Sequence, residues 1–233
     1  MTTELNWPSH DIVNSHDDPF LFEIVEFLVK VRAVEPDVTA SIQAAIPEGA
    51  APHGLRYRLK HWQSLKRKAE GVIAMNPYAF DGLASIAEIA RAALRKIDDI
   101  LRYSVLSTSH DDVSVHASLF LEQVHSDGMS VVSILNSYHE GSRYKGLHAI
   151  LSLQHRFDLD IDCEVQFHSP ESIDAYVCTH EIYEELRTTE GLEERQAFHD
   201  IIAARYQLVD DIMVDGNIFP IPITNRTLRR PLE

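Results

Sequence analysis

At 233 residues the chain is long enough to bury one hydrophobic core. Hydrophobic residues make up 45% of it and charged residues 24%, a balance that is typical of globular domains and argues against a disordered chain. Because 21 Lys and Arg face 36 Asp and Glu, the net charge is −15; such a surface repels duplex nucleic acid and anionic lipid, so a basic site has to be local.

The two cysteines, Cys163 and Cys178, indicate free or buried thiols in a reducing compartment rather than a disulfide framework. The first 18 residues, MTTELNWPSHDIVNSHDD, lack the basic region and apolar run of a leader. No stretch approaches the roughly 20 apolar residues that a membrane span needs. We therefore expect a cytoplasmic protein with no membrane partner, although delivery into the cytosol of another cell stays open.

The N-terminal segment, residues 1–50, is expected to be helical. Apolar residues with near-helical spacing predict one helix at 19–34 and a second at about 37–46. The run PEGAAPHG at 47–54 is typical of a linker. After it, residues 55–74 predict a long amphipathic helix with apolar residues on one side and Arg and Lys on the other.

The rest of the chain alternates between helical and strand-like patterns. In order, we expect a helix at 82–97, a strand at 100–106, a helix from Asp112 to about His125, strands at 130–138, 147–154 and 161–168, and helices at 171–187 and 191–209. Helices before, between and after about four strands predict an α+β fold with one sheet covered by helices. We expect residues 51–233 to form the main domain, and the two parts together to make one compact unit.

The first group of candidate functional residues lies in the predicted helix at 55–74. Six of the thirteen residues from 56 to 68 are basic, which is out of character for a chain of this net charge. On a helix, Lys60, Ser64 and Lys68 lie four apart and share one face, where they could grip consecutive phosphates. The alternative is a solvated basic stripe, which is the commoner origin of such a run and is slightly favoured by the run alone.

Acidic residues form the second group. Asp98 or Asp99 precedes one predicted strand and Glu164 lies within another, and two carboxylates brought together from separate strands can hold Mg²⁺. Asp158, Asp160 and Asp162 alternate with Glu164, so all four would lie on one face of a continuous strand, which is unfavourable unless that face is wet or binds metal. A hairpin turn that contains Asp158 and Asp160 is the simpler alternative.

Tyr144, next to Gly146 in a tight turn, could stack on a nucleobase, although a core or rim tyrosine is the commoner case. His180 begins the run HEIYEE, which lacks the second histidine of the HExxH zinc motif, so we do not expect zinc. Neither GxxxxGKS/T nor GxGxxG occurs, so the sequence supports neither a Walker nor a Rossmann type of nucleotide site.

Taken in order, these segments resemble the synthetase domain of the RelA/SpoT family over residues 55–187. Arg58-x-Lys60-xxx-Ser64-xxx-Lys68 resembles the family's RxKxxxSxxxK helix, and Asp99 is similar to the first residue of its DxxGxR strand. The resemblance implies that Arg58 stacks on the adenine of ATP, that Lys60 and Lys68 hold its phosphates with Ser64 between them, and that Asp99 binds Mg²⁺.

Two further motifs belong to the same resemblance. Tyr144 and His148 match the end of the family's NGYxSLH motif, and Glu164 and Gln166 match its E-V/I-Q strand. His180 is similar to the histidine of the helix that follows. The resemblance implies acceptor binding by Tyr144, His148, Gln166 and His180, and a double role for Glu164 as metal ligand and activator of the acceptor hydroxyl. It also implies a mixed sheet of about four or five strands, of nucleotidyltransferase type.

The sequence departs from the family mainly on the acceptor side. Arg102 and Ser104 stand where DxxGxR has Gly and Arg, and His168 replaces the Arg of EVQIRT. Ser142-Arg143 replaces Asn-Gly before the tyrosine, and Glu140 lies near the place of an expected lysine. ATP is therefore better supported as donor than GDP or GTP as acceptor.

The function that the resemblance implies is an ATP- and Mg²⁺-dependent pyrophosphokinase. It would transfer the β,γ-pyrophosphate of ATP to the 3′-hydroxyl of a purine nucleotide, making (p)ppGpp or (p)ppApp with AMP as leaving group. Since no hydrolase domain precedes the segment, we expect a small alarmone synthetase or a growth-inhibiting toxin with an antidote or immunity protein; a homo-oligomer stays open. The alternatives are a catalytically inactive nucleotide-sensing module and a tRNA 3′-end pyrophosphokinase, the latter least favoured by the charge of −15.

Overall fold

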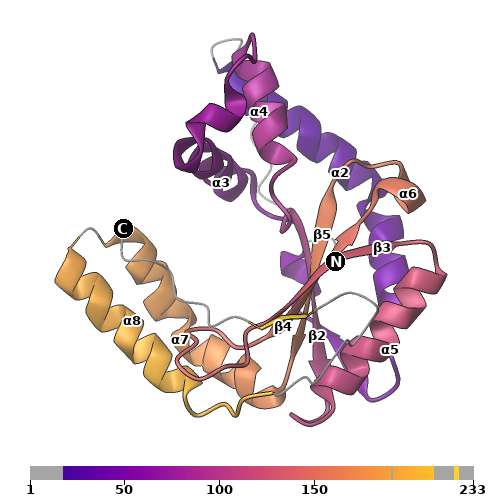
Figure 1. Ribbon diagram of the computed structural model, residues 1–233, viewed down its shortest axis with the longest axis vertical. Helices are drawn as coiled ribbons and strands as arrows, with labels where there is room; N and C mark the ends of the chain where they lie inside the picture. The colour runs from indigo at the N-terminus through magenta and orange to yellow at the C-terminus, as the bar shows by residue number, and fades with distance from the viewer. Residues whose placement is uncertain (1–17, 190, 213–222, 226–233) are drawn as a thin grey trace.

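The computed structural model describes residues 18–189, 191–212 and 223–225 (Figure 1). Its centre is a sheet of six strands, in the order β1-β2-β5-β4-β3-β6. The strands are β1 (Ala50–His53), β2 (Leu101–Ser107), β3 (Ser130–Asn136), β4 (Leu147–Ser152), β5 (Asp162–His168) and β6 (Ile223–Asn225). The β2/β5 and β3/β6 pairs are parallel and the other neighbours are antiparallel. The predicted α+β fold with a mixed sheet is thus confirmed.

Two short strands at the sheet edges were not predicted. We interpreted residues 47–54 as a linker, and this was wrong for β1, which pairs with β2 from Ala50↔Ser107 to His53↔Ser104. The sequence Ala-Ala-Pro-His has little strand propensity, and Pro52 is tolerated because an edge strand needs hydrogen bonds on one side only. The three-residue strand β6 has too short a pattern to be recognised.

Seven α-helices lie within the described residues, in the following chain order. They are α2 (Pro19–Ala44), α3 (Trp62–Met75), α4 (Ile86–Leu94), α5 (Val113–Ser126), α6 (Gln154–Phe157), α7 (Pro170–Thr188) and α8 (Leu192–Tyr206), with short 3₁₀ turns η1 (Leu55–Tyr57) and η2 (Pro77–Phe80). The predicted helices at 82–97, 112–125, 171–187 and 191–209 are confirmed; α4 and α8 are shorter than predicted, and the ends of α5 and α7 differ from the prediction by one residue. Among the described residues, no helix is both long and apolar enough to cross a membrane.

The N-terminal segment forms one helix where two were expected. Asp18 caps α2 by accepting a hydrogen bond from the backbone N–H of Leu21 (2.9 Å), and the helix then continues through Pro36. Proline usually interrupts a helix because it lacks an N–H and crowds the preceding turn. Here Val31 and Val38 are fully buried on either side of it, so burial of the apolar stripe outweighs the lost hydrogen bond.

The predicted helix at 55–74 was also wrong in its first third. The backbone N–H of Lys60 donates to the carbonyl of Ile100 (2.9 Å), and Leu59 forms a β-bridge with Leu101. Hydrogen bonds to the start of β2 therefore replace helical ones, and α3 begins only at Trp62. Lys60 does not share a helix face with Ser64 and Lys68.

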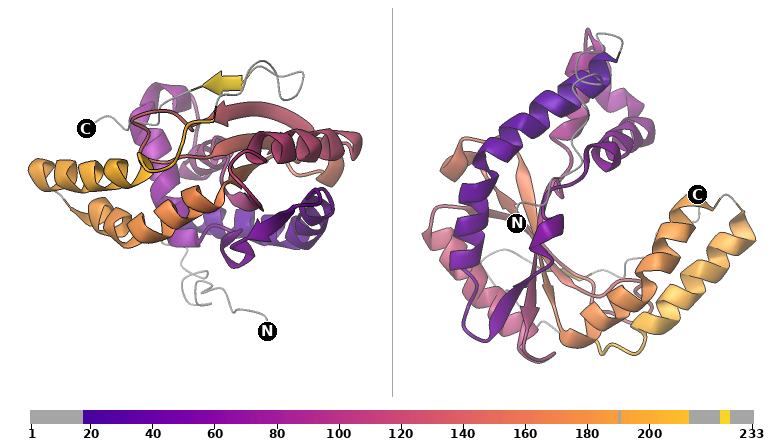
Figure 2. Two further views of the ribbon diagram at one scale, coloured as in Figure 1. Left: turned by 90° about the horizontal axis from the view of Figure 1, so that it is seen from below. Right: turned by 180° about the vertical axis from the view of Figure 1, so that it is seen from behind.

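The two faces of the sheet differ in chemistry. Apolar side chains of β2, β4 and β5 are buried on one face, including Leu101, Val105, Val165 and Phe167. Helices α2 and α5 lie along this side, and α5 contacts all three strands (Figure 2). Helices α3, α7 and α8 lie on the other side (Figure 1). The alternation of side chains along each strand sends the polar residues to that second face.

Candidate active site

The second face of the sheet carries a row of polar side chains from three neighbouring strands. The register places Arg102 of β2 beside Glu164 of β5, and Gln166 of β5 beside His148 of β4. Each of them alternates with a buried apolar residue, as the burial pattern of β2 shows. We call this the polar face. It gathers residues from the predicted acceptor motifs and one of the two predicted metal ligands.

Asp99 lies at the entry to β2 and holds two lysines. Its carboxylate binds the ammonium of Lys60 at 3.0 Å and that of Lys68 at 2.6 Å. Lys60 arrives from the extended segment before α3 and Lys68 from α3 itself. The structure thus brings Asp99, Lys60 and Lys68 together by sheet pairing, although Lys60 does not lie on the helix face that was expected to carry it with Ser64 and Lys68.

The ionisation of this group follows from its burial and its charges. Burial raises the pKa of Asp99, but the positive charges of Lys60 and Lys68 outweigh this effect and lower it overall. Burial also lowers the pKa of Lys60 more than Asp99 raises it. Asp99 is therefore an ionised carboxylate at neutral pH, next to cations that are only partly solvated.

Ser64 is the predicted ATP residue that stands apart. It lies on α3 one turn before Lys68. Among the described residues its hydroxyl accepts a long hydrogen bond from Arg67 (3.4 Å) rather than contacting Lys60 or Asp99.

Arg58 is anchored by the N-terminal helix. Its Nε and Nη2 donate to the two oxygens of Glu35, and its Nη1 donates to the carbonyl of Leu55 (2.9 Å). Thr39 also donates a hydrogen bond to Glu35 (2.5 Å). Because two nitrogens of the guanidinium already donate to Glu35, the part of Arg58 that best suits a ligand is the flat face of the guanidinium, which stacks well on aromatic rings. The side chain is 31% exposed, so that face is within reach of a ligand.

We expect Glu35→Gln to lower the free energy of unfolding by about 1–2 kcal/mol, since Arg58 is too exposed for a larger effect. Burial raises the pKa of Glu35, but its hydrogen bonds to Arg58 and Thr39 outweigh this and lower it overall. The difference should therefore be present above the ordinary value of 4.5 and vanish as the pH falls through the lowered pKa. Urea denaturation measures it, with Glu26→Gln on an exposed part of the same helix as control. Equal losses in both variants would contradict the prediction.

Glu164 is fixed by a histidine. Its Oε1 lies 2.7 Å from Nδ1 of His148, and both side chains are largely buried. Burial raises the pKa of Glu164, but the hydrogen bond and charge of His148 and a hydrogen bond from Gln166 lower it overall. The negative charge of Asp99 acts on the pKa of Glu164 in the opposite sense, so Asp99 is near enough to influence Glu164 electrostatically.

Tyr144 lies in a cluster of rings above the polar face. Its hydroxyl donates to Oε1 of Gln166 (2.9 Å) and lies 3.0 Å from Nε2 of His168. Its ring contacts those of His148, His168, Tyr176 and Tyr206. Burial raises the pKa of the Tyr144 hydroxyl well above 10, so it is a neutral donor.

Gly146 is what allows these rings to converge. A Cβ at this position would lie 3.0 Å from the ring of His168, 3.1 Å from that of His148 and 3.3 Å from that of Tyr144. The glycine of the predicted tight turn therefore serves close packing, because any larger residue would displace a ring.

His168, one of the departures from the family pattern, is buried and uncharged. Burial lowers its pKa to about 3, and the electrostatic effect of His148 acts in the same direction. In the unfolded chain His168 binds a proton as the pH falls below about 6.5, whereas in the folded protein it stays neutral down to about pH 3. The free energy of unfolding is therefore unaffected by this histidine above pH 6.5 and decreases as the pH drops toward 3. Between pH 6.5 and 5 we expect a loss of about 2 kcal/mol.

The test compares the pH dependence of unfolding in His168→Gln, whose amide does not titrate, with that in wild type. The variant should show a flatter curve between pH 6.5 and 5, whatever its absolute stability. His155→Gln, at an exposed position on α6, is the matched control and should keep the wild-type slope. A wild-type slope in His168→Gln would assign the effect to other groups.

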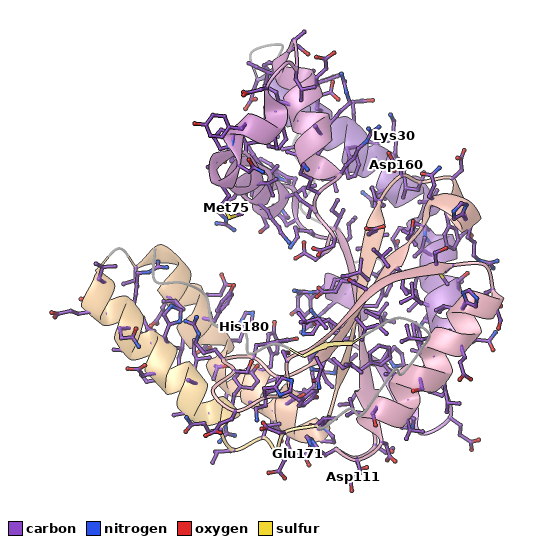
Figure 3. The ribbon with its side chains drawn as sticks, in the orientation of Figure 1. Lys30, Met75, Asp111, Asp160, Glu171 and His180 are labelled. Atoms are coloured by element: carbon purple, nitrogen blue, oxygen red, sulfur yellow. The ribbon has the colours of Figure 1, made fainter. Side chains whose placement is uncertain are left out.

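His180 lies on α7, exposed, with its ring 5.4 Å from that of Tyr176. Figure 3 places it on the side of α7 that faces α3. Tyr176 in turn contacts Tyr144 at 6.5 Å. An aromatic chain thus leads from the exposed His180 to the half-buried Tyr144, and links the fourth predicted acceptor residue to the other three.

The arrangement of acidic and metal-ligating side chains limits which metal the site can hold. Within the described ranges no cluster of three or more His, Cys, Asp or Glu side chains is suited to a metal ion. Asp99 and Glu164 offer two carboxylates. This set fits Mg²⁺, which prefers hard oxygen ligands and commonly completes its shell with water and substrate phosphates. It does not fit zinc, which takes three or four protein ligands.

The sequence reasoning missed three residues that the structure brings to the site: Glu35, Arg102 and Tyr176. Glu35 could have been found, because it falls in the apolar stripe formed by Val31 and Val38, and a carboxylate in such a stripe needs a partner. Arg102 was noted only as a departure. Tyr176 has no sequence signal beyond its place in a helix.

No protein-family model matches the sequence, and no curated protein matches it either. Several solved structures are similar in the arrangement of their elements. They include small alarmone synthetase 1 from Bacillus subtilis bound to its product pppGpp (16% identity, 78% of this chain and 90% of that chain, TM-score 0.45), small alarmone synthetase 2 from Bacillus subtilis (14%, 82% and 92%, 0.45) and a GTP pyrophosphokinase family protein from Streptococcus pneumoniae (17%, 83% and 86%, 0.44).

Proposed function

We propose that this chain is an ATP-dependent pyrophosphokinase that transfers the β,γ-pyrophosphate of ATP to the 3′-hydroxyl of a purine nucleotide. The observation that carries the proposal is the convergence of Lys60 and Lys68 on Asp99, which is near enough to influence Glu164 electrostatically. Two cations beside two carboxylates can receive a metal–polyphosphate complex, because the lysines pair with phosphate oxygens while the carboxylates take the metal.

Donor binding follows from the partners of the basic residues. Lys60 and Lys68 would exchange their contacts with Asp99 for the phosphates of ATP, and the flat face of Arg58 would stack on adenine. Mg²⁺, held by Asp99 and Glu164, would neutralise the charge of the phosphate chain. For the acceptor we propose Tyr144, His148, Gln166 and His180, with the exposed end of the aromatic chain at His180 nearest to an incoming base.

The chemistry needs one proton transfer and one displacement. Glu164, oriented by the 2.7 Å contact with His148, would accept the proton of the acceptor's 3′-hydroxyl. The 3′-oxygen then bonds to the β-phosphorus of ATP, the bond between that phosphorus and the oxygen bridging to the α-phosphate breaks, and AMP leaves with the electron pair. Positioning and charge neutralisation would supply most of the rate enhancement, as in other phosphoryl transfers.

The products we propose are (p)ppGpp or (p)ppApp, made in the cytoplasm. Because the departures from the family pattern lie on the acceptor side, among them Arg102 and His168, the acceptor is the least determined part. A growth-inhibiting toxin held by an antidote or immunity protein is the second biological role that we propose for the same reaction.

The experiment incubates the purified chain with Mg²⁺ and γ-labelled ATP, adding GDP, GTP, ADP, further ATP or tRNA in turn, and separates the products by anion exchange. We expect AMP together with a more highly phosphorylated, labelled purine nucleotide. The acceptor that gives most product distinguishes (p)ppGpp from (p)ppApp synthesis, and label on tRNA would select the tRNA reaction. Binding of ATP without AMP or label transfer for any acceptor would reject the enzyme and leave a nucleotide-sensing module.

A further inference from the structure

Arg102 is a cation on the polar face that the fold itself does not neutralise. Its backbone N–H donates to the carbonyl of Arg58 (2.8 Å), which fixes its place at the start of β2. Arg58, Lys60 and Lys68 each have a carboxylate partner. The guanidinium of Arg102 forms no ion pair within residues 18–189, 191–212 and 223–225, although its strand partner is Glu164, whose carboxylate turns to His148 instead.

The positive charge of Arg102 affects the pKa values of groups on both sides of the site. Burial lowers the pKa of Lys60, and Arg102 is among the charges that lower it further. On the other side, burial raises the pKa values of Tyr144 and Tyr176, and Arg102 opposes both rises. Arg102 is thus close enough to act electrostatically on groups assigned above to the donor and on groups assigned to the acceptor, in agreement with its backbone hydrogen bond to Arg58 and its strand pairing with Glu164.

A half-buried guanidinium without a counter-ion is unfavourable, because burial removes hydration that no partner replaces. Its planar fork is well suited to phosphate oxygens, which it can bind through two parallel hydrogen bonds. Lysine lacks this geometry, because its ammonium group is a single point charge. The chemistry that fits this position is thus a phosphate group whose negative charge is shared with Lys60.

We propose that Arg102 binds the polyphosphate chain of the nucleotide substrate at the point between donor and acceptor. The identity of the nucleotide in this inference rests on the proposed function, whereas the binding of phosphate by Arg102 does not. Arg102 is therefore assigned as a substrate-binding residue.

The experiment measures binding of inorganic tripolyphosphate to the full chain by calorimetry in the presence of Mg²⁺. We expect Arg102→Gln to weaken binding about tenfold or more, since a hydrogen-bonded charge pair is lost. Arg102→Lys keeps the charge without the fork and should give an intermediate affinity. The matched control is Lys30→Gln, which removes one positive charge at an exposed position of α2 and should bind like wild type (Figure 3). Thermal unfolding checks that each variant is folded. If Arg102→Gln does not fold, the affinity of Arg102→Lys tests the inference instead.

Wild-type affinity in Arg102→Gln, or an equal loss in Lys30→Gln, would overturn the inference. So would a wild-type chain that does not bind tripolyphosphate. Failure of the proposed function has a different signature: no AMP forms from ATP with any acceptor, while tripolyphosphate still binds and the binding still depends on Arg102.

Discussion

Glu164→Gln is expected to lose about 10²–10⁴-fold in the rate of AMP formation. Glutamine has nearly the volume of glutamate and keeps an oxygen that can accept the hydrogen bond from Nδ1 of His148, now 2.7 Å from the carboxylate. It carries no negative charge, so it can neither take the proton of the acceptor hydroxyl nor serve as an anionic ligand for Mg²⁺. The free energy of unfolding should change by about 1 kcal/mol or less.

Asp162→Asn is the matched control for Glu164→Gln, because it removes a half-buried carboxylate two residues earlier on the same strand. It should keep a turnover close to wild type. Both rates are read from AMP release with the acceptor that the product assay selects, and both variants are compared by urea denaturation. A Glu164→Gln protein that is folded and turns over like wild type would remove Glu164 from the chemistry.

Asp99→Asn is expected to lose about 10²–10³-fold in turnover, because it removes one metal ligand and the group that orients two phosphate-binding lysines. A cost in stability should accompany it. Burial raises the pKa of Asp99, but the charges and hydrogen bonds of Lys60 and Lys68 lower it by more, so the pKa lies below its ordinary value of 3.8. Its stabilising contribution is therefore present above that value and lost as the pH falls through the lowered pKa, so wild type and variant should converge in acid.

The neighbouring residue provides a sharp control for Asp99→Asn. Asp98 is 53% exposed, and its carboxylate lies 3.5 Å from the ammonium of Lys68. Asp98→Asn should therefore keep most of the turnover, since the closer contacts of Asp99 remain. If Asp98→Asn is the damaging variant and Asp99→Asn is not, the metal ligand has been assigned to the wrong one of two adjacent carboxylates.

How far the fold could be predicted varies along the chain. Strands β2, β4 and β5 and helix α5 were found because they combine a clear pattern with strong burial, as in the alternation of buried and half-buried residues in Leu101–Ser107. The break expected near Pro36 was wrong because tertiary packing of Val31 and Val38 holds α2 together across the proline. Strand β1 could not be found, since its four residues carry no pattern apart from their partner.

The site was predictable in its residue types and less so in its geometry. Asp99, Glu164, Lys60 and Lys68 were named from motifs, and the structure brings Lys60 and Lys68 to Asp99. Their roles in catalysis remain predictions. The contacts that give each side chain its orientation, such as those of Glu35 and His148, join segments far apart in the chain and leave almost no local signal.

By itself the sequence determined the order of most helices and strands, the apolar and polar sides of the central strands, and the presence of a local basic segment in an acidic chain. These follow from short-range periodicity and composition. Only the tertiary structure decided that Lys60 approaches Asp99 through pairing with β2, that Glu35 holds Arg58, and that Arg102 has no carboxylate partner among the residues that the structure describes. The reason is that such contacts depend on which distant segments are buried together, and no local sequence pattern predicts the free energy of that burial.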